Sequence, residues 1–369
     1  MSPIRILVVD DSAVIRKVLC ESLSVDPAIE VAATAANGHI ALSKIAQLNP
    51  DLVTLDVEMP VMNGLETLAK IREIQPKLPV IMFSTLTERG AASTLEALAL
   101  GASDYVTKPS NTGSPAEAAN RVRAELLPKI KALCGRREAA APRFSPAAAP
   151  IRTTARPAIA PRIDVLAMGT STGGPNALGV VVPMLPADLP VPVVIVQHMP
   201  PIFTRLLAER LSANSKLRVR EGEAGKLLEP GTVWIAPGNY HLVIERHGPG
   251  FYIGLNQEPH ENSCRPAVDV LFRSVARSYG AHVLGAVMTG MGADGLIGSR
   301  LIREGGSEVI VQDEATSVVW GMPGAVAAAG EADGIYALDQ LGPEITRRIL
   351  KSRARAEAIP AGERQRAAR

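Results

Sequence analysis

Short apolar runs alternate with amphipathic stretches along most of the chain, and this alternation constrains the fold more than any other feature. The first series contains IRILVVD, EVAATA, DLVTLDV, PVIMFST and DYVTK, separated by helix-like stretches such as AVIRKVLCESLS and GLETLAKIREI. A second series contains IDVLAM, PVVIVQ, TVWIAP, HLVIE, AHVLGAVM and SEVIVQ. Strand and helix patterns in alternation predict parallel sheets with helices on both faces. The expected fold class is therefore α/β, with two doubly wound parallel-sheet domains.

The segment between the two series differs in composition and sets the expected domain boundaries. Residues 135–161 are rich in Ala, Pro and Arg and lack an apolar period, so we interpret them as a linker. The first domain is then expected over residues 1–134 and the second over residues 162–345. Residues 346–369 are basic and low in apolar content, which predicts a solvated, disordered tail.

Composition and charge argue against several classes of protein. The formal net charge is +2, which gives no nucleic-acid signature. No apolar run reaches the roughly 18 residues that a membrane helix needs, and the N-terminus does not resemble a signal peptide. Cys20, Cys134 and Cys264 lie far apart, with no CxxC metal pattern and no disulfide framework. We therefore expect a cytoplasmic protein that neither binds DNA nor inserts into a membrane.

Charged and hydroxyl side chains end the predicted strands of the first domain. Asp10 and Asp11 follow the first strand, and Asp56 ends the third. Carboxylates at one edge of a parallel sheet repel one another unless a hard cation joins them, and Mg²⁺ suits oxygen ligands of this kind. Ser84 and Lys108 end the fourth and fifth strands and complete a phosphoryl site in which Asp56 accepts the phosphoryl group. The alternative is that single acids only cap helices.

Residues 1–125 resemble a response-regulator receiver domain in VVDDS, LDVEMPVMNG, MFST and GASDYVTKP. The resemblance implies a flavodoxin-like fold and phosphorylation of Asp56 by a histidine-kinase partner. It implies a Mg²⁺ site formed by Asp11, Asp56 and the backbone carbonyl of Glu58, with Asp10 behind them. The phosphoryl site and switch that it implies consist of Ser84, Lys108 and Tyr105.

The stretch MGTSTGGP, at residues 168–175, follows a predicted buried strand and allows two interpretations. A phosphate-binding turn needs G-x-G-x-x-G and an acid at the end of the next strand. Here Ser171 replaces the second glycine, and the next strand ends in Gln197 and His198. The other interpretation is G-x-S-x-G over residues 169–173, a strand-to-helix turn that presents a serine nucleophile. Such a serine needs a base and a group that orients the base.

His198 is the expected base because it directly follows the second strand of this series, at the same sheet edge as Ser171. Asp294 follows AHVLGAVM in a glycine-rich loop, which places a carboxylate at that edge. Asp269 in RPAVDVLF is the rival acid, and it also fits a helix cap. The order Ser, His, Asp differs from that of α/β-hydrolases, but geometry rather than order defines a triad.

Residues 162–345 resemble the catalytic domain of chemotaxis protein-glutamate methylesterases in GTSTGGP, VQHMPPIFT, APGNYHL, RPAVDVLF, MTGMGADG and QDEATSVVWGMPGAVA. One departure is Ala267, where a small hydroxyl residue is expected. The residues that the resemblance implies are a triad of Ser171, His198 and Asp294, an oxyanion contact from the Met291 amide, and Thr172 beside the nucleophile.

The activity that this resemblance implies is a phosphorylation-controlled serine hydrolase of chemotaxis. It would remove methyl groups from glutamate γ-methyl esters of chemoreceptors, release methanol and deamidate receptor glutamines, with no cofactor in this domain. Two rival classes are a DNA-binding response regulator and a receiver joined to a nucleotide-binding domain. The first needs a helix-turn-helix with a basic face, whereas the second domain offers about six strands. The second is disfavoured by Ser171 and Gln197.

Overall fold

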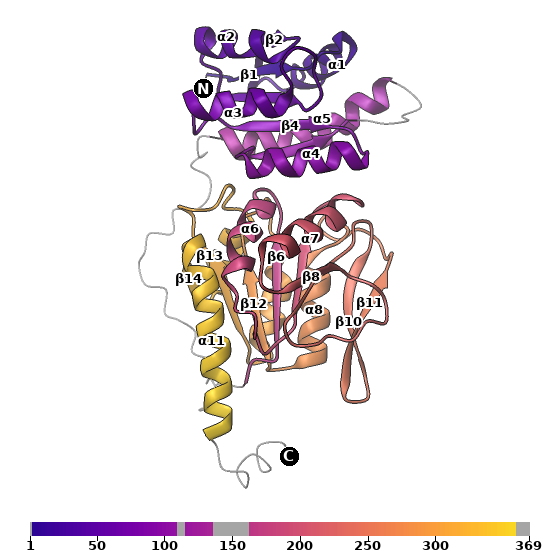
Figure 1. The fold of residues 1–369 in the computed structure, drawn as a ribbon, viewed down its shortest axis with the longest axis vertical. Helices are drawn as coiled ribbons and strands as arrows, with labels where there is room; N and C mark the ends of the chain where they lie inside the picture. Colours follow the sequence, from indigo (N-terminus) through magenta and orange to yellow (C-terminus); the bar gives the residue numbers. More distant parts are fainter. Residues whose placement is uncertain (1, 109–114, 136–161, 359–369) are drawn as a thin grey trace. The chain divides into compact units, whose positions relative to one another are not determined.

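The first apolar series and all but one run of the second form parallel sheets, each in its own structural unit (Figure 1). The computed structural model describes residues 2–108, 115–135 and 162–358, and the chain divides into units of residues 1–143 and 144–369. No helix within these described ranges is long and apolar enough to cross a membrane. The α/β fold class with two parallel sheets is confirmed.

The sheet of the first unit has the strand order β2-β1-β3-β4-β5, and all its pairs are parallel. Its strands are β1 (Ile4–Val9), β2 (Ile29–Ala35), β3 (Leu52–Asp56), β4 (Val80–Ser84) and β5 (Asp104–Thr107). Its helices are α1 (Ala13–Leu23), α2 (Gly38–Leu48), α3 (Gly64–Ile74), α4 (Glu88–Ala99) and α5 (Pro115–Cys134). This is the flavodoxin-like order, in which the crevice for a ligand lies where the chain changes direction, between β1 and β3.

The sheet of the second unit has seven parallel strands in the order β14-β13-β12-β6-β7-β9-β8. Its strands are β6 (Val165–Thr170), β7 (Val193–Gln197), β8 (Arg218–Glu221), β9 (Thr232–Ile235), β12 (Val283–Val287), β13 (Glu308–Gln312) and β14 (Gly334–Tyr336). The helices are α6 (Gly174–Met184), α7 (Phe203–Asn214), α8 (Val268–Tyr279), α9 (Leu296–Glu304), α10 (Met322–Ala328) and α11 (Leu338–Ala358). The corresponding crevice lies between β6 and β12.

Helix α8 packs one face against this sheet. Its residues Val268, Leu271, Phe272 and Val275 are fully buried, at the spacing of one helical face. Their cluster includes side chains of β6, β7, β12 and β13. This packing fixes the N-terminus of α8 near the carboxyl edge of the sheet, where the predicted catalytic residues lie.

The stretch HLVIE does not continue the parallel series, so that prediction is wrong. It belongs to β10 (His241–His247), which pairs antiparallel with β11 (Gly250–Asn256) in a separate two-stranded sheet. The chain reverses through Gly248, whose φ is 59°. The hairpin lies on the opposite side of the unit from α11 (Figure 1). Strands β8, β11 and β14 were not among the predicted ones.

The prediction of a disordered tail from residue 346 is also wrong as far as residue 358. These residues continue α11, which packs against α6. Leu341, Ile345 and Ile349 are fully buried on one face of this helix, and basic residues cover much of the rest. An apolar residue at every fourth position suffices to anchor a helix whose overall composition is polar. Residues 359–369 lie outside the described part of the chain.

Candidate functional sites

Ser171 lies in the turn between β6 and α6, at the carboxyl edge of the sheet. Its N–H donates to the Thr289 carbonyl at 3.0 Å, and its carbonyl accepts from Gln197 Nε2 at 3.0 Å. A Cβ on Gly174 would lie 1.9 Å from Gln197 Oε1, and Gly173 has a φ of 77°. Both glycines are therefore needed for the turn. The left-handed backbone occurs at Gly173, two residues after the serine.

His198 and Asp294 meet at the same edge. His198 directly follows β7, and its Nε2 lies 2.7 Å from Asp294 Oδ2; the Asp294 side chain is buried and the His198 side chain is 12% exposed. Asp294 lies in the loop between β12 and α9. The three predicted triad residues thus follow three adjacent strands, β7, β6 and β12. Within residues 162–358, no hydrogen bond joins Ser171 Oγ to His198.

Asp294 is surrounded by hydrogen-bond donors. Its Oδ2 also accepts the N–H of Val268 at 2.7 Å. Its Oδ1 accepts the N–H groups of Asp269 and Gly295, both at 2.9 Å, and Asn262 Nδ2 at 2.8 Å. The Val268 and Asp269 amides belong to the first turn of α8, where a helix favours negative charge. These contacts hold the carboxylate ionised and fix its orientation.

The two partners shift each other's pKa. Burial acts to raise the pKa of Asp294, but its hydrogen bond with His198 and those from the α8 amides outweigh burial and lower it. Burial acts to lower the pKa of His198, but the hydrogen bonds with Asp294 and then Cys264 raise it. The pair therefore stabilises an imidazolium beside a carboxylate, as the transfer of a proton to His198 requires.

The rival acid, Asp269, has a different role. Its Oδ1 accepts the Gly298 N–H at 2.7 Å, and its Oδ2 accepts Asn262 Nδ2 at 3.0 Å. It links α8 to the first turn of α9 and forms no hydrogen bond with His198. Burial raises its pKa to about 6, against the effect of the Gly298 amide. The geometry therefore favours Asp294 as the acid that orients the imidazole.

Two residues of the site, Asn262 and Cys264, were not predicted from the sequence. Asn262 bridges Asp294 and Asp269, and Cys264 Sγ lies 3.4 Å from His198 Nδ1. Both lie in the loop between β11 and α8, and an ion pair of 2.7 Å from Glu261 to Arg273 ties this loop to α8. The only signal was their position just before RPAVDVLF, because this loop does not follow a strand of the main sheet.

The predicted oxyanion residues lie beside the serine. A Cβ on Gly290 would be 2.8 Å from Ser171 Cβ, so the loop that carries Met291 passes next to the nucleophile. The Met291 N–H donates to no acceptor in the part of the chain that the structure describes, whereas the Gly290 N–H donates to Val319 at 3.1 Å. Thr172 is buried, and its carbonyl accepts from Thr289 Oγ1 at 2.9 Å.

In the first unit, three predicted acids gather between β1 and β3. Ligand oxygens of Asp10, Asp11 and Asp56 lie within 4.8 Å of one another. Lys108 Nζ lies 2.8 Å from Asp56 Oδ2 and 3.0 Å from Asp10 Oδ2. Burial raises the pKa of Asp56 to about 6; Lys108 opposes this rise and the charge of Asp10 adds to it. A donor set made of carboxylate oxygens fits Mg²⁺, whose charge would relieve this repulsion.

A cavity of about 230 Å³ opens beside these acids. Its lining residues are Asp11, Asp56, Val57, Glu58, Ser84, Thr85, Gly90 and Lys108. Ser84 Oγ donates to the Gly90 carbonyl at 3.0 Å. Tyr105 is buried in β5 and does not line the cavity, and the Glu58 carboxylate is 3.5 Å from Arg89. Four predicted residues, Asp11, Asp56, Ser84 and Lys108, thus share one hollow with Glu58.

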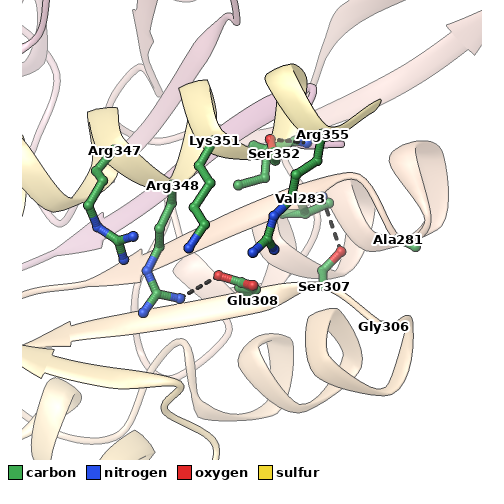
Figure 2. A pocket seen from close by; sticks show the side chains of 11 residues that line it. Ala281, Val283, Gly306, Ser307, Glu308, Arg347, Arg348, Lys351, Ser352 and Arg355 are labelled. Carbon is green, nitrogen blue, oxygen red and sulfur yellow. Dashed lines mark hydrogen bonds and ion pairs between the residues drawn. The ribbon is translucent and has the colours of Figure 1, made fainter. Parts of the chain in front are cut away.

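A second cavity, of about 240 Å³, lies at the other edge of the second sheet and is not the catalytic site (Figure 2). It adjoins the beginnings of β12 and β13, and Arg347, Arg348, Lys351 and Arg355 point into it from α11 (Figure 2). Its two hydroxyls are already engaged, since Ser307 donates to Gly280 and Ser352 donates to Ile349. Glu308 pairs with Arg348. No lining residue of this cavity is a cysteine or histidine that could serve acyl transfer.

Comparisons with known proteins show which families the two units resemble. The CheB methylesterase family model matches residues 166–345, and the response regulator receiver domain model matches residues 6–120. A protein-glutamate methylesterase/protein-glutamine glutaminase of Trichodesmium erythraeum is 52% identical, over 95% of this chain and 100% of that protein. One of Nocardioides sp. is 53% identical, over 98% and 99%.

Among solved structures, the CheB methylesterase catalytic domain of Thermotoga maritima matches with a TM-score of 0.50 and 38% identity, covering 50% of this chain and 98% of that chain. The chain belongs to the protein-glutamate methylesterase/protein-glutamine glutaminase family and joins a response-regulator receiver domain to a CheB methylesterase domain.

Proposed function

We propose that Ser171, His198 and Asp294 form the catalytic triad with which this member of the family hydrolyses glutamate γ-methyl esters of chemoreceptors. The observation that carries the proposal is the 2.7 Å bond between His198 and Asp294, at the crevice where Ser171 also lies. An acid that is saturated with donors orients a base, and a buried base activates a hydroxyl.

In this mechanism His198 takes the proton of Ser171 Oγ as the hydroxyl attacks the γ-carbonyl. Because Nε2 is bonded to Asp294, the nitrogen that takes the proton is Nδ1. The proton then passes to the departing methoxide, and methanol leaves an acyl-serine. Water, deprotonated by the same nitrogen, hydrolyses the acyl-enzyme to the glutamate. The Met291 N–H, which has no protein acceptor among the described residues, is the donor for the oxyanion of both steps.

The same acyl chemistry deamidates glutamine, because ammonia can leave in place of methanol. The His198 imidazolium donates the proton that makes ammonia a leaving group. We infer chemoreceptor glutamates and glutamines as the substrates from the family. A receptor helix presents its side chain from a large surface, so binding energy remote from the carbonyl contributes to turnover.

We also infer that the first unit is phosphorylated at Asp56 by a histidine kinase and thereby controls the hydrolase. Asp11 and Asp56, with the Glu58 backbone carbonyl, would hold the Mg²⁺, with Asp10 behind them. Bound Mg²⁺ would neutralise charge on the incoming phosphoryl oxygens. Lys108, 2.8 Å from Asp56, would contact the same oxygens, and Ser84 lines the hollow that would receive them.

The test of the triad measures methanol release from methylated receptor membranes by the full chain. Ser171→Ala is compared with Ser215→Ala, a matched change in the loop after α7, where Ser215 Oγ donates only to the local Leu217 carbonyl. We expect Ser171→Ala to lose nearly all turnover and Ser215→Ala to keep it. A Ser171→Ala enzyme that retains more than about a tenth of turnover contradicts the proposal, since removing a triad nucleophile costs about 10⁶-fold.

A further inference from the structure

Cys264 contacts the base nitrogen of the proposed triad, and neither the family comparisons nor the mechanism gives it a role. Its Sγ lies 3.4 Å from His198 Nδ1, within hydrogen-bond range for sulfur. The opposite nitrogen, Nε2, is bonded to Asp294 at 2.7 Å. Both ring nitrogens are therefore occupied, and the one that should serve Ser171 faces a sulfur.

Two acceptors, one at each N–H, favour the protonated ring. The Asp294 carboxylate lies at one ring nitrogen, and the Cys264 sulfur, which can accept an N–H, lies at the other. A doubly protonated ring cannot take a proton from Ser171. The two contacts that stabilise the imidazolium after proton transfer would therefore also stabilise it in the free enzyme, before substrate binds.

We propose that Cys264 is a positioning residue whose sulfur accepts a hydrogen bond from Nδ1 of protonated His198. It holds the ring in a resting state that must open before Ser171 can transfer its proton. This inference rests on the proposed triad and adds a regulated starting state to it. In the working state, Nδ1 has released its proton to solvent water, leaves the sulfur and turns its lone pair to Ser171 Oγ, while the Asp294 bond persists.

The loop that carries Cys264 is held firmly enough for this role. Arg265, the next residue, donates from Nη1 to the Gln257 and Glu258 carbonyls at 2.9 Å and from Nη2 to Asn239 Oδ1 at 2.7 Å. Cys264 and Glu261 exchange backbone hydrogen bonds at 2.9 and 3.1 Å. A sulfur on an anchored loop meets the ring at a fixed place.

Few other charged groups lie close enough to His198 to keep its imidazole protonated. The titratable groups that face the ring are Asp294, from the loop before α9, and Cys264, from the loop before α8. Asp269 faces Asp294 through Asn262, and Glu261 is neutralised by its ion pair with α8. Among the described residues, only Asp294 and Cys264 form hydrogen bonds with the imidazole, and Asp294 is needed to orient it.

The experiment compares Cys264→Ala and Cys264→Ser in the full chain, with kcat and KM measured on methylated receptor membranes from pH 6 to pH 10. The alanine variant removes the acceptor at Nδ1, so the ring should lose its proton at lower pH. We expect the acidic limb of the kcat/KM profile to shift to lower pH by about 0.5–1 unit. At a fixed pH at the foot of the limb, this shift raises kcat/KM about three- to tenfold. The plateau at high pH and KM should stay near wild type.

The serine variant serves as the conservative rescue, because its hydroxyl oxygen also accepts from an N–H. Its acidic limb should lie closer to wild type than that of the alanine variant. Cys20→Ser in α1, far along the chain, is the matched cysteine control and should change nothing. Thermal unfolding of each variant checks the fold.

The outcomes separate this proposal from the triad. If the acidic limbs of Cys264→Ala, Cys264→Ser and wild type coincide, or if the alanine limb moves to higher pH, the positioning role is wrong while the triad stands. If Cys264→Ala abolishes turnover and Ser171→Ala does not, cysteine is the nucleophile and both proposals fail. A loss of turnover in both Cys264 variants with unchanged unfolding temperature also contradicts a positioning role that serine can fill.

Discussion

Asp56 and Asp294 occupy equivalent places in the two units but have opposite surroundings. Asp56 ends β3 and Asp294 follows β12, and each lies at a crevice where strand order reverses. Asp294 accepts five hydrogen bonds, and its pKa lies below the ordinary value. Asp56 has one cation, one backbone N–H donor from Glu58 at 3.4 Å and a neighbouring acid, and burial raises its pKa to about 6.

These surroundings determine which chemistry each carboxylate can carry out. A carboxylate whose lone pairs are all taken has none left for attack or for a metal, so it can only orient and stabilise a neighbour. A carboxylate that is short of donors is costly to keep charged and is relieved by a cation or by reaction with a phosphoryl group. The surroundings of Asp294 therefore suit a residue that orients His198. The surroundings of Asp56 suit a residue that binds a cation or reacts with a phosphoryl group.

The largest expected effects come from removing the groups that form and break bonds. Ser171→Ala and His198→Ala should each reduce kcat by on the order of 10⁵–10⁶, and the double variant should be little worse than either, because a triad acts as a unit. Single-turnover assays on methylated receptor measure this. Effects that multiply in the double variant would show that the two residues act separately.

Changing the saturated carboxylate itself tests the first half of the comparison. Asp294→Asn should reduce kcat by about 10⁴, because an amide turns an N–H₂ toward the donors and no longer stabilises the imidazolium. Asp269→Asn is the matched control, since Asp269 is buried nearby but does not touch His198. The kcat of Asp269→Asn should stay within about tenfold of the wild-type value. Equal losses in both variants would remove the distinction between the two acids.

The raised pKa of His198 predicts where activity falls in acid. The neutral imidazole is the base, so kcat/KM should decline on the acid side at a pH above the value of about 6.5 for an unperturbed histidine. A pH profile of the full chain on receptor membranes measures this. An acidic limb at or below pH 6.5 would mean that Asp294 and Cys264 do not stabilise the charged ring in the working enzyme.

The smallest effect concerns the stability of the first unit. The folded pKa of Asp56, about 6, lies above its reference value of 3.8, so the ionised carboxylate costs stability. This cost is absent below about pH 4 and complete above about pH 6. Asp56→Asn should therefore raise the unfolding temperature of the first unit at pH 7 by roughly a few degrees and have no such effect near pH 4.

Calorimetry of the full chain at the two pH values measures this change, and Mg²⁺ provides the second arm. Mg²⁺ should stabilise the wild type more than Asp56→Asn, because it relieves the same repulsion. The variant should also lose any rise in turnover caused by a small-molecule phosphodonor while keeping the basal rate. A variant that is less stable than wild type at pH 7 would contradict the strain assigned to Asp56.

Much of this arrangement was predictable because the two sheets are parallel. Strand ends in the sequence become neighbours at one edge, so Ser171, His198 and Asp294 could be placed together from the apolar runs alone. The 2.7 Å contact between His198 and Asp294 was not predictable, because it depends on loop conformation. The role of Asp269 as a link between α8 and α9 required the fold.

The wrong or missing predictions also have physical causes, because each depends on features that the strand pattern does not specify. HLVIE has the composition of a buried strand, but the turn at Gly248 pairs it with the next run instead of the main sheet. In the basic sequence of α11, Ile345 and Ile349 stand among charged residues, and only their spacing indicates the buried face of the helix. Cys264 reaches His198 from a loop outside the strand pattern, so no strand end pointed to it.

The most direct test of the central claim is the site and rate of labelling by a fluorophosphonate, read by mass spectrometry of the full-length protein. A fluorophosphonate reacts with a serine only where a base and its orienting acid activate it. We predict one labelled peptide, containing Ser171, with labelling retained in Asp269→Asn and slowed by orders of magnitude in His198→Ala and Asp294→Asn. Labelling of a different residue, or of Ser171 at the wild-type rate in Asp294→Asn, would contradict it.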